Sequence, residues 1–207
     1  MPTLPNPKNG NFTPAPEGSH PAACYRIIDL GTQETTYKGV TSHKHQLIVS
    51  WELFTDEKMP DGRPFTIGKK YSWSTHEKST LRKDLEMWRG KKFQDTDFGP
   101  GGFSIEKILG QPCLIAVQHG EYNGNVTSSV VAITKLPKGM PVNGPTNEIL
   151  FVWLDKEEFS QAAFDKLSDK LKETIQKSPE YKAMISGNPV AIESLHQGVD
   201  PSDEIPL

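Results

Sequence analysis

The sequence predicts a mainly β protein with helical additions, and two features of the chain carry this prediction. Five segments either alternate apolar and polar residues or concentrate β-branched and aromatic residues between turn signals, as strands do. A single segment with helical periodicity interrupts them between the third and the fourth. The longest apolar run, ILFVWL at 149–154, has the length of a strand and is far shorter than the ~20 residues of a membrane span.

The expected strands are separated by segments rich in turn-forming residues. QETTYKGVTSHK (33–44) is interpreted as a turn-rich connection after the first strand, and DEKMPDGRP (56–64) as a turn after the second. Asn123 and Gly124 form a strong hairpin signal between the last two strands. The strands are expected at 22–32, 45–54, 65–74 and on the two sides of Asn123-Gly124 within 113–136, and EILFVWL (148–154) is a candidate sixth.

The interrupting segment, STHEKSTLRKDLEMWRG, predicts an amphipathic helix. Ser74 and Glu77 stand in capping-box spacing, in which each side chain can satisfy the other residue's backbone N–H. Gly90 is expected to end the helix. The apolar positions that follow the cap have helical spacing: Leu81, Leu85 and Trp88.

The order strand, strand, strand, helix, strand, strand is that of the OB-fold, a five-stranded Greek-key barrel. A short sandwich could also contain five strands, but a helix between the third and fourth favours the barrel. We therefore predict four regions: a disordered Pro-rich arm (1–21), the barrel (22–154), a helical extension (155–186) and a flexible acidic tail (187–207). The extension carries one apolar stripe expected to pack on the barrel: Phe164, Leu167, Leu171 and Ile175.

Composition indicates where the protein is located and which class of partner it binds. The N-terminus has no secretion-signal pattern, and the two cysteines, Cys24 and Cys113, lie in apolar stretches typical of buried, reduced thiols. These features favour a cytoplasmic protein that neither spans nor binds a membrane. Residues 63–92 hold nine basic and three acidic side chains, whereas residues 151–207 hold six basic and eleven acidic ones. A basic body with an acidic end suggests a nucleic acid or an acidic partner, although an ordinary solvated face would look the same.

The sequence contains none of the common motifs of catalytic, nucleotide-binding or metal sites. There is no phosphate-binding loop ending in Lys-Ser/Thr, no Gly-x-Ser-x-Gly and no His-Glu-x-x-His. His43 and His45 share a strand face, but their spacing with Cys113 and His119 fits no compact metal site. We expect neither catalysis, nor a cofactor, nor a metal.

Basic and aromatic residues alternate in two segments, TIGKKYSWS (66–74) and MWRGKKF (87–93). Single-stranded nucleic acid is bound by this mixture, because cations follow the phosphates while aromatic rings stack on unpaired bases. The groove of an OB-fold lies on the second and third strands and between the first and last hairpin loops. The predicted DNA-binding residues are Tyr37, Lys38, Lys44, Lys69, Lys70, Tyr71, Trp73, Arg82, Lys83, Arg89, Lys91, Lys92 and Tyr122.

Some of these aromatic residues have a structural alternative. Trp51 shares its strand face with Leu47, Val49 and Leu53, and Trp88 lies on the helical stripe, so both are interpreted as core. Tyr71 and Trp73 stay open between stacking and core, because Lys69 lies on the same side of their strand. The cations cannot be core; they either bind or solubilise.

The last five residues, DEIPL, resemble the tip of bacterial-type single-stranded DNA-binding proteins, which end in acidic residues followed by Ile-Pro-Phe. In that family the tip docks on replication and repair proteins. The resemblance implies that Asp203, Glu204, Ile205, Pro206 and Leu207 bind replication or recombination partners, with leucine in place of phenylalanine. The stretches ACYRIIDLGTQ and STLRKDLEMWRGKKF also resemble phage-encoded proteins that coat single-stranded DNA, which implies an OB-fold and no cofactor.

The sequence thus predicts a non-enzymatic protein that binds and protects single-stranded DNA in phage replication or recombination. It would recruit partners through its tail and could form oligomers. Two alternatives remain: an OB-like protein–protein adaptor or phage accessory protein that does not bind nucleic acid, and a nuclease, which would need clustered carboxylates.

Overall fold

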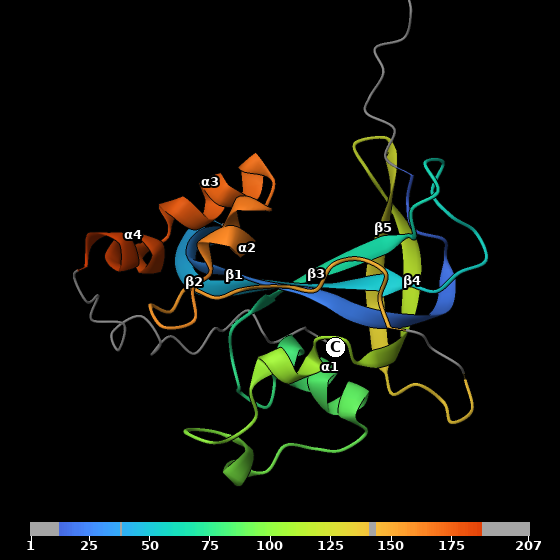
Figure 1. Ribbon diagram of the computed structural model, residues 1–207, viewed down its shortest axis with the longest axis horizontal. Helices are drawn as coiled ribbons and strands as arrows, with labels where there is room; N and C mark the ends of the chain where they lie inside the picture. The colour runs from blue at the N-terminus through green and yellow to red at the C-terminus, as the bar shows by residue number, and fades with distance from the viewer. Residues whose placement is uncertain (1–12, 38, 141–143, 188–207) are drawn as a thin grey trace, which may run out of the picture.

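The structure, a computed structural model, describes residues 13–37, 39–140 and 144–187 (Figure 1). Six strands and four α-helices make up this part of the chain, together with two short 3₁₀ helices, η1 and η2. The strands are β1 (Gly18–Tyr37), β2 (Val40–Leu53), β3 (Thr66–Ser72), β4 (Pro112–Tyr122), β5 (Asn125–Thr134) and β6 (Leu150–Val152). The helices are α1 (Thr80–Arg89), η1 (Asp95–Asp97), η2 (Ile105–Ile108), α2 (Gln161–Asp165), α3 (Asp169–Lys177) and α4 (Pro179–Ser186).

The strands form one open, mainly antiparallel sheet in the order β3-β2-β1-β4-β5, and β6 adds to β1 in parallel at residues 26–28. The edge strands β3 and β5 approach each other closely, so the sheet is strongly curled. No backbone pairing joins these two edges in the described residues. The prediction of a mainly β protein with a helix between the third and fourth strands is therefore confirmed, but the sheet is not closed into a barrel.

The first hairpin is longer than the sequence predicted. Residues 33–44, expected to be a connection, continue β1 and β2, which pair as far as Tyr37 and Val40. β1 also starts at Gly18, inside the expected arm, because residues 18–23 pair with β4. The hairpin was missed because its outer half extends beyond the core and has polar residues on both faces, so it lacks the alternation expected of a half-buried strand. The Asn123-Gly124 turn is confirmed, with positive φ at both residues.

The main core lies on the concave side of the sheet. Trp51 and Leu47 from β2 pack with Cys24 and Ile115 from the neighbouring strands. Helix α1 covers one end of this core, below the sheet in Figure 1, and contributes Leu81, Leu85 and Trp88. Trp51 and Trp88 pack ring against ring at 6.0 Å, as core residues should. The interpretation of both tryptophans as core is confirmed.

Helix α1 starts later than the capping box indicated. Ser79, not Ser74, is the N-cap, and its hydroxyl oxygen accepts the backbone N–H of Arg82. The Ser79 hydroxyl also donates to the Ser74 carbonyl, so residues 74–78 form a turn in place of a first helical turn. Gly90 ends the helix with φ +70°, as predicted.

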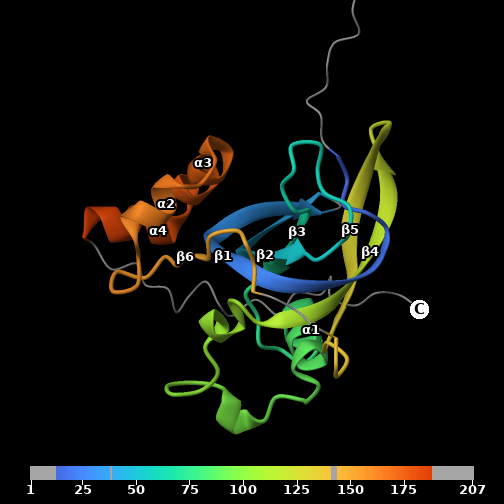
Figure 2. The ribbon, with the colours of Figure 1, turned by 45° about the vertical axis from the view of Figure 1, so that its right-hand side comes forward.

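A second, smaller core lies on the convex side of the sheet. Ile28 and Leu30 of β1 and Val152 of β6 pack there against the C-terminal helices, which form a separate group beside the β1–β6 end of the sheet in Figure 2. The stripe of Phe164, Leu167 and Ile175 is buried in this core, with Leu171 half-buried beside it. The prediction that the stripe packs on the sheet is confirmed. The stripe is divided between α2, which carries Phe164, the connection with Leu167, and α3, because Ser160 and Ser168 start the two helices separately.

Candidate nucleic-acid interface

Tyr71 is a core residue of β3 and is not available to a base. Its side chain is 4% exposed, and its hydroxyl donates a 2.8 Å hydrogen bond to Oδ2 of Asp84 on α1. Burial and the Asp84 charge raise the pKa of the phenol. The same oxygen lies 2.7 Å from Nζ of Lys69. The predicted stacking of Tyr71 is therefore wrong, because its ring joins β3 to α1.

Trp73 is half-buried just beyond the end of β3. Its ring packs edge-on against Trp153 at 5.0 Å, and Trp153 lies parallel to Phe151 of β6 at 5.8 Å. Trp73 also lines a cavity of about 320 Å³ together with Arg82 and Phe98. One part of the ring is thus packed in the core and another faces a cavity, and stacking of Trp73 on a base stays a prediction.

Two predicted phosphate ligands are used inside the protein. The Arg82 guanidinium donates to Glu86 at 3.0 Å and lies over the Phe98 ring at 5.0 Å. The Arg89 guanidinium lies 4.1 Å from the centre of the Phe93 ring and 3.6 Å from Asp97. These contacts hold the loop that follows α1, residues 93–98, in place. They also neutralise part of the positive charge that the sequence assigned to the groove.

Four predicted cations face solvent. Lys70, Lys83, Lys91 and Lys92 are exposed, and none of their side chains makes a hydrogen bond or ion pair with a described residue. Lys70 points away from the core, on the opposite face of β3 from Lys69 and Tyr71. These lysines are therefore available to an anionic ligand, in contrast to Lys69.

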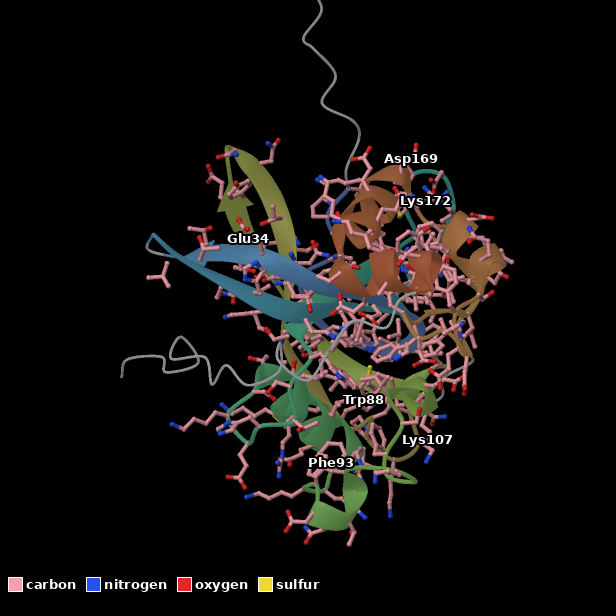
Figure 3. The ribbon with its side chains drawn as sticks, turned by 90° about the vertical axis from the view of Figure 1, so that its left-hand side faces the viewer. Glu34, Trp88, Phe93, Lys107, Asp169 and Lys172 are labelled. Carbon is pink, nitrogen blue, oxygen red and sulfur yellow. The ribbon has the colours of Figure 1, made fainter. Side chains whose placement is uncertain are left out.

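The hairpin residues are only partly described. Tyr122, at the tip of the β4–β5 hairpin, is 70% exposed, and Lys44 of β2 is half-buried. The Tyr37 side chain and Lys38 lie outside the described residues, as does the predicted tail, Asp203 to Leu207. The β1–β2 hairpin, which carries Glu34, extends to the left in Figure 3, whereas the β4–β5 hairpin rises at the other end of the sheet in Figure 1.

The convex face of β2 is partly covered at the place where an OB-fold groove was expected. Glu52 is 1% exposed, and its carboxylate accepts the backbone N–H groups of Thr146 and Asn147 at 2.8–3.0 Å. Burial alone would raise the pKa of Glu52, but these hydrogen bonds outweigh it and lower the pKa. The buried carboxylate anchors the segment before β6 across this end of the strand, and the cover leaves less of the strand open to a ligand.

A basic pocket lies at the α1 end of the sheet, and most of its charge was not predicted. Its volume is about 440 Å³, and it lies between α1, η2 and the ends of β4 and β5. Lys107 and Lys135, both exposed, contribute cations beside Arg89. Sequence reasoning missed these two lysines because the pocket is assembled from four separate segments. The apolar lining is formed by Leu85, Trp88, Phe103, Ile108, Pro112 and Leu136.

Neither a metal cluster nor a membrane-spanning helix is found in the part of the chain that the structure describes. No three His, Cys, Asp or Glu side chains gather there as a possible metal site. None of the described helices is long and apolar enough to cross a membrane. No protein-family model and no curated protein matches the sequence.

Proposed function

We propose that this protein binds single-stranded DNA without sequence specificity and protects it during replication or recombination, in a phage or phage-like setting. The observation that carries the proposal is the strand order. A curled sheet in the order β3-β2-β1-β4-β5, with α1 between β3 and β4, has the connectivity of an OB-fold whose last edge is left unpaired. OB-folds commonly bind single strands along a cationic surface.

The distribution of accessible charge supports the same function. Lys83, Lys91 and Lys92 on and after α1, and Lys70 on β3, are exposed cations without a partner among the described residues. Tyr122 offers an exposed ring on the last hairpin, and Trp73 a half-buried one. These cations could contact phosphates, and the two rings could contact bases. We further propose that the tip Asp203–Leu207 recruits replication or recombination proteins.

The proposal is tested by titrating the full chain with fluorescein-labelled oligo-dT and measuring fluorescence anisotropy at several salt concentrations. We expect binding that weakens with salt, with a slope of log K against log salt near −0.7 for each phosphate neutralised. A duplex of the same length serves as the control and should bind more weakly. Absence of binding, or equal affinity for single strand and duplex, would contradict the proposal. Shortening of the oligonucleotide after addition of magnesium would favour a nuclease instead.

A further inference from the structure

We infer that the basic pocket, defined by Arg89, Lys107 and Lys135 around its apolar lining, is where the protein accepts one nucleobase and its flanking phosphates. This inference rests on the proposed function and specifies the part of the surface that carries it. It places the strand at the α1 end of the sheet, away from the partly covered face of β2.

The charge of the pocket is only partly neutralised by the described residues. Lys107 and Lys135 are exposed, and neither forms an ion pair or side-chain hydrogen bond with a described residue. Nη1 of Arg89 is buried and has no acceptor among the described residues. Asp97 engages the other terminal nitrogen of Arg89, Nη2, at 3.6 Å. The pocket therefore holds an excess of positive charge and one buried donor without a partner, and both favour an anionic ligand.

The apolar lining favours a ligand that carries an apolar group in addition to its negative charge. Trp88 and Ile108 are buried at its base, and the Trp88 indole N–H donates to the Pro112 carbonyl at 2.8 Å, which holds the ring in place. Roughly 300–1,000 Å³ is typical of pockets that bind small organic molecules, and about 440 Å³ lies in this range. A flat, largely apolar group with negative charge beside it matches such a pocket, and a nucleotide unit has this chemistry.

The cations continue beyond the pocket, which favours a strand over an isolated anion. Lys91 and Lys92 follow directly from Gly90, the C-cap of α1, and a Cβ built on Gly90 would lie 3.2 Å from Cδ of Lys135. The backbone N–H of Lys135 also donates to the Met87 carbonyl, so the end of β5 is fixed against α1. In Figure 3, Lys107 projects from the same lower lobe as Trp88 and Phe93. Successive phosphates on the two sides of one base could therefore each contact a cation.

The experiment compares two double variants that change the charge equally. Lys107→Glu with Lys135→Glu reverses the rim of the pocket. Lys170→Glu with Lys182→Glu is the matched control, because both lysines are exposed on α3 and α4, which lie on the opposite side of the sheet from α1 (Figure 1). The probe is labelled oligo-dT, used with the full chain, and the readout is the affinity at several salt concentrations. Circular dichroism checks that both variants fold.

We expect the pocket variant to bind oligo-dT at least tenfold more weakly at low salt. The slope of its log K against log salt should be shallower by about 1.4, or 0.7 for each lysine. The control should lose much less affinity and retain the wild-type slope. An oligonucleotide of abasic sites, which keeps its phosphates, should bind the wild-type protein roughly fivefold or more weakly, because one stacked base is lost.

Failure of the inference and failure of the proposed function give different results. If the wild-type protein binds oligo-dT but the two double variants weaken binding equally, the strand lies elsewhere and only the inference is overturned. If abasic and normal strands bind the wild-type protein equally, no base enters the pocket and the inference is overturned. It is also overturned if a peptide of residues 196–207 binds only when the rim is intact and displaces no DNA, because the pocket then accepts an acidic peptide. If the wild-type protein binds no oligonucleotide, both fail.

Discussion

Nε2 of His45 donates a 2.6 Å hydrogen bond to the carboxylate of Asp29, at the place where the C-terminal helices join the sheet. Glu180 of α4 lies 3.9 Å from the other ring nitrogen of His45. Glu180 also accepts the backbone N–H and the hydroxyl of Thr32, at 2.8 and 2.5 Å. A histidine on β2 thus lies between two buried carboxylates, one from β1 and one from α4, and this polar cluster fixes the helices to the sheet.

This arrangement makes stability depend on the charge of His45. Burial alone would favour the neutral imidazole, but the hydrogen bond and charge of Asp29 and the charge of Glu180 outweigh it, so the pKa is raised above 6.5. The stabilisation is complete below about pH 6.5 and is lost as pH rises through the raised pKa. We expect the free energy of unfolding in urea to fall over that interval. The fall should be smaller in His45→Gln, and an unchanged pH profile in that variant would contradict the role of His45.

Gly31 allows α4 to approach β1. Its φ is +66°, and a Cβ at this position would lie 2.6 Å from the Ser178 side chain. We expect Gly31→Ala to destabilise the protein by about 2 kcal/mol or more, because both the backbone and the close contact become strained. Gly39→Ala is the matched control, since Gly39 also has positive φ (+79°) but no atom of the described residues beyond its chain neighbours lies within 4 Å of an added Cβ. It should cost only about 1 kcal/mol, and equal losses in the two variants would show that the contact with Ser178 is unimportant.

The substitution Tyr71→Phe tests whether the Tyr71 ring has a structural role or contacts DNA. Tyr71→Phe removes the hydrogen bond to Asp84, whose carboxylate still accepts from Lys69. We expect a loss of about 1–2 kcal/mol in the free energy of unfolding and no change in affinity for oligo-dT. A tenfold weaker affinity in a folded variant would show that the ring contacts DNA after all.

The acidic tail is tested by its removal. We expect a chain lacking Asp203–Leu207 to bind oligo-dT as tightly as the full chain or more tightly at low salt, because an acidic segment competes with DNA for cations. The difference should disappear at high salt, where screening weakens both interactions. In a pull-down with replication or recombination proteins, partner binding should be lost. Weaker DNA binding after truncation would mean that the tail contributes to the DNA site.

Local sequence patterns predicted an element correctly where the residues of that segment alone determine its structure. The helical spacing of Leu81, Leu85 and Trp88, the C-cap at Gly90 and the Asn123-Gly124 turn are all present as predicted. The element order and the burial of Trp51 also followed from periodicity, because the apolar residues of a half-buried strand or helix are spaced so that they lie on its buried face. The boundaries of the first hairpin could not be predicted from periodicity, because its outer half has no buried face and therefore no alternation of apolar and polar residues.

Which charges remain available to a ligand was decided only by the tertiary structure. Lys69 and Lys70 are neighbours in sequence, yet one pairs with Asp84 of α1 and the other faces solvent. Lys107 and Lys135 belong to different segments, and folding brings both to the pocket with Arg89. Strand alternation assigns a side chain to a face, but its partner comes from a distant part of the chain. The sequence by itself determined which elements form; their packing decided which cations are used internally and which are left for a ligand.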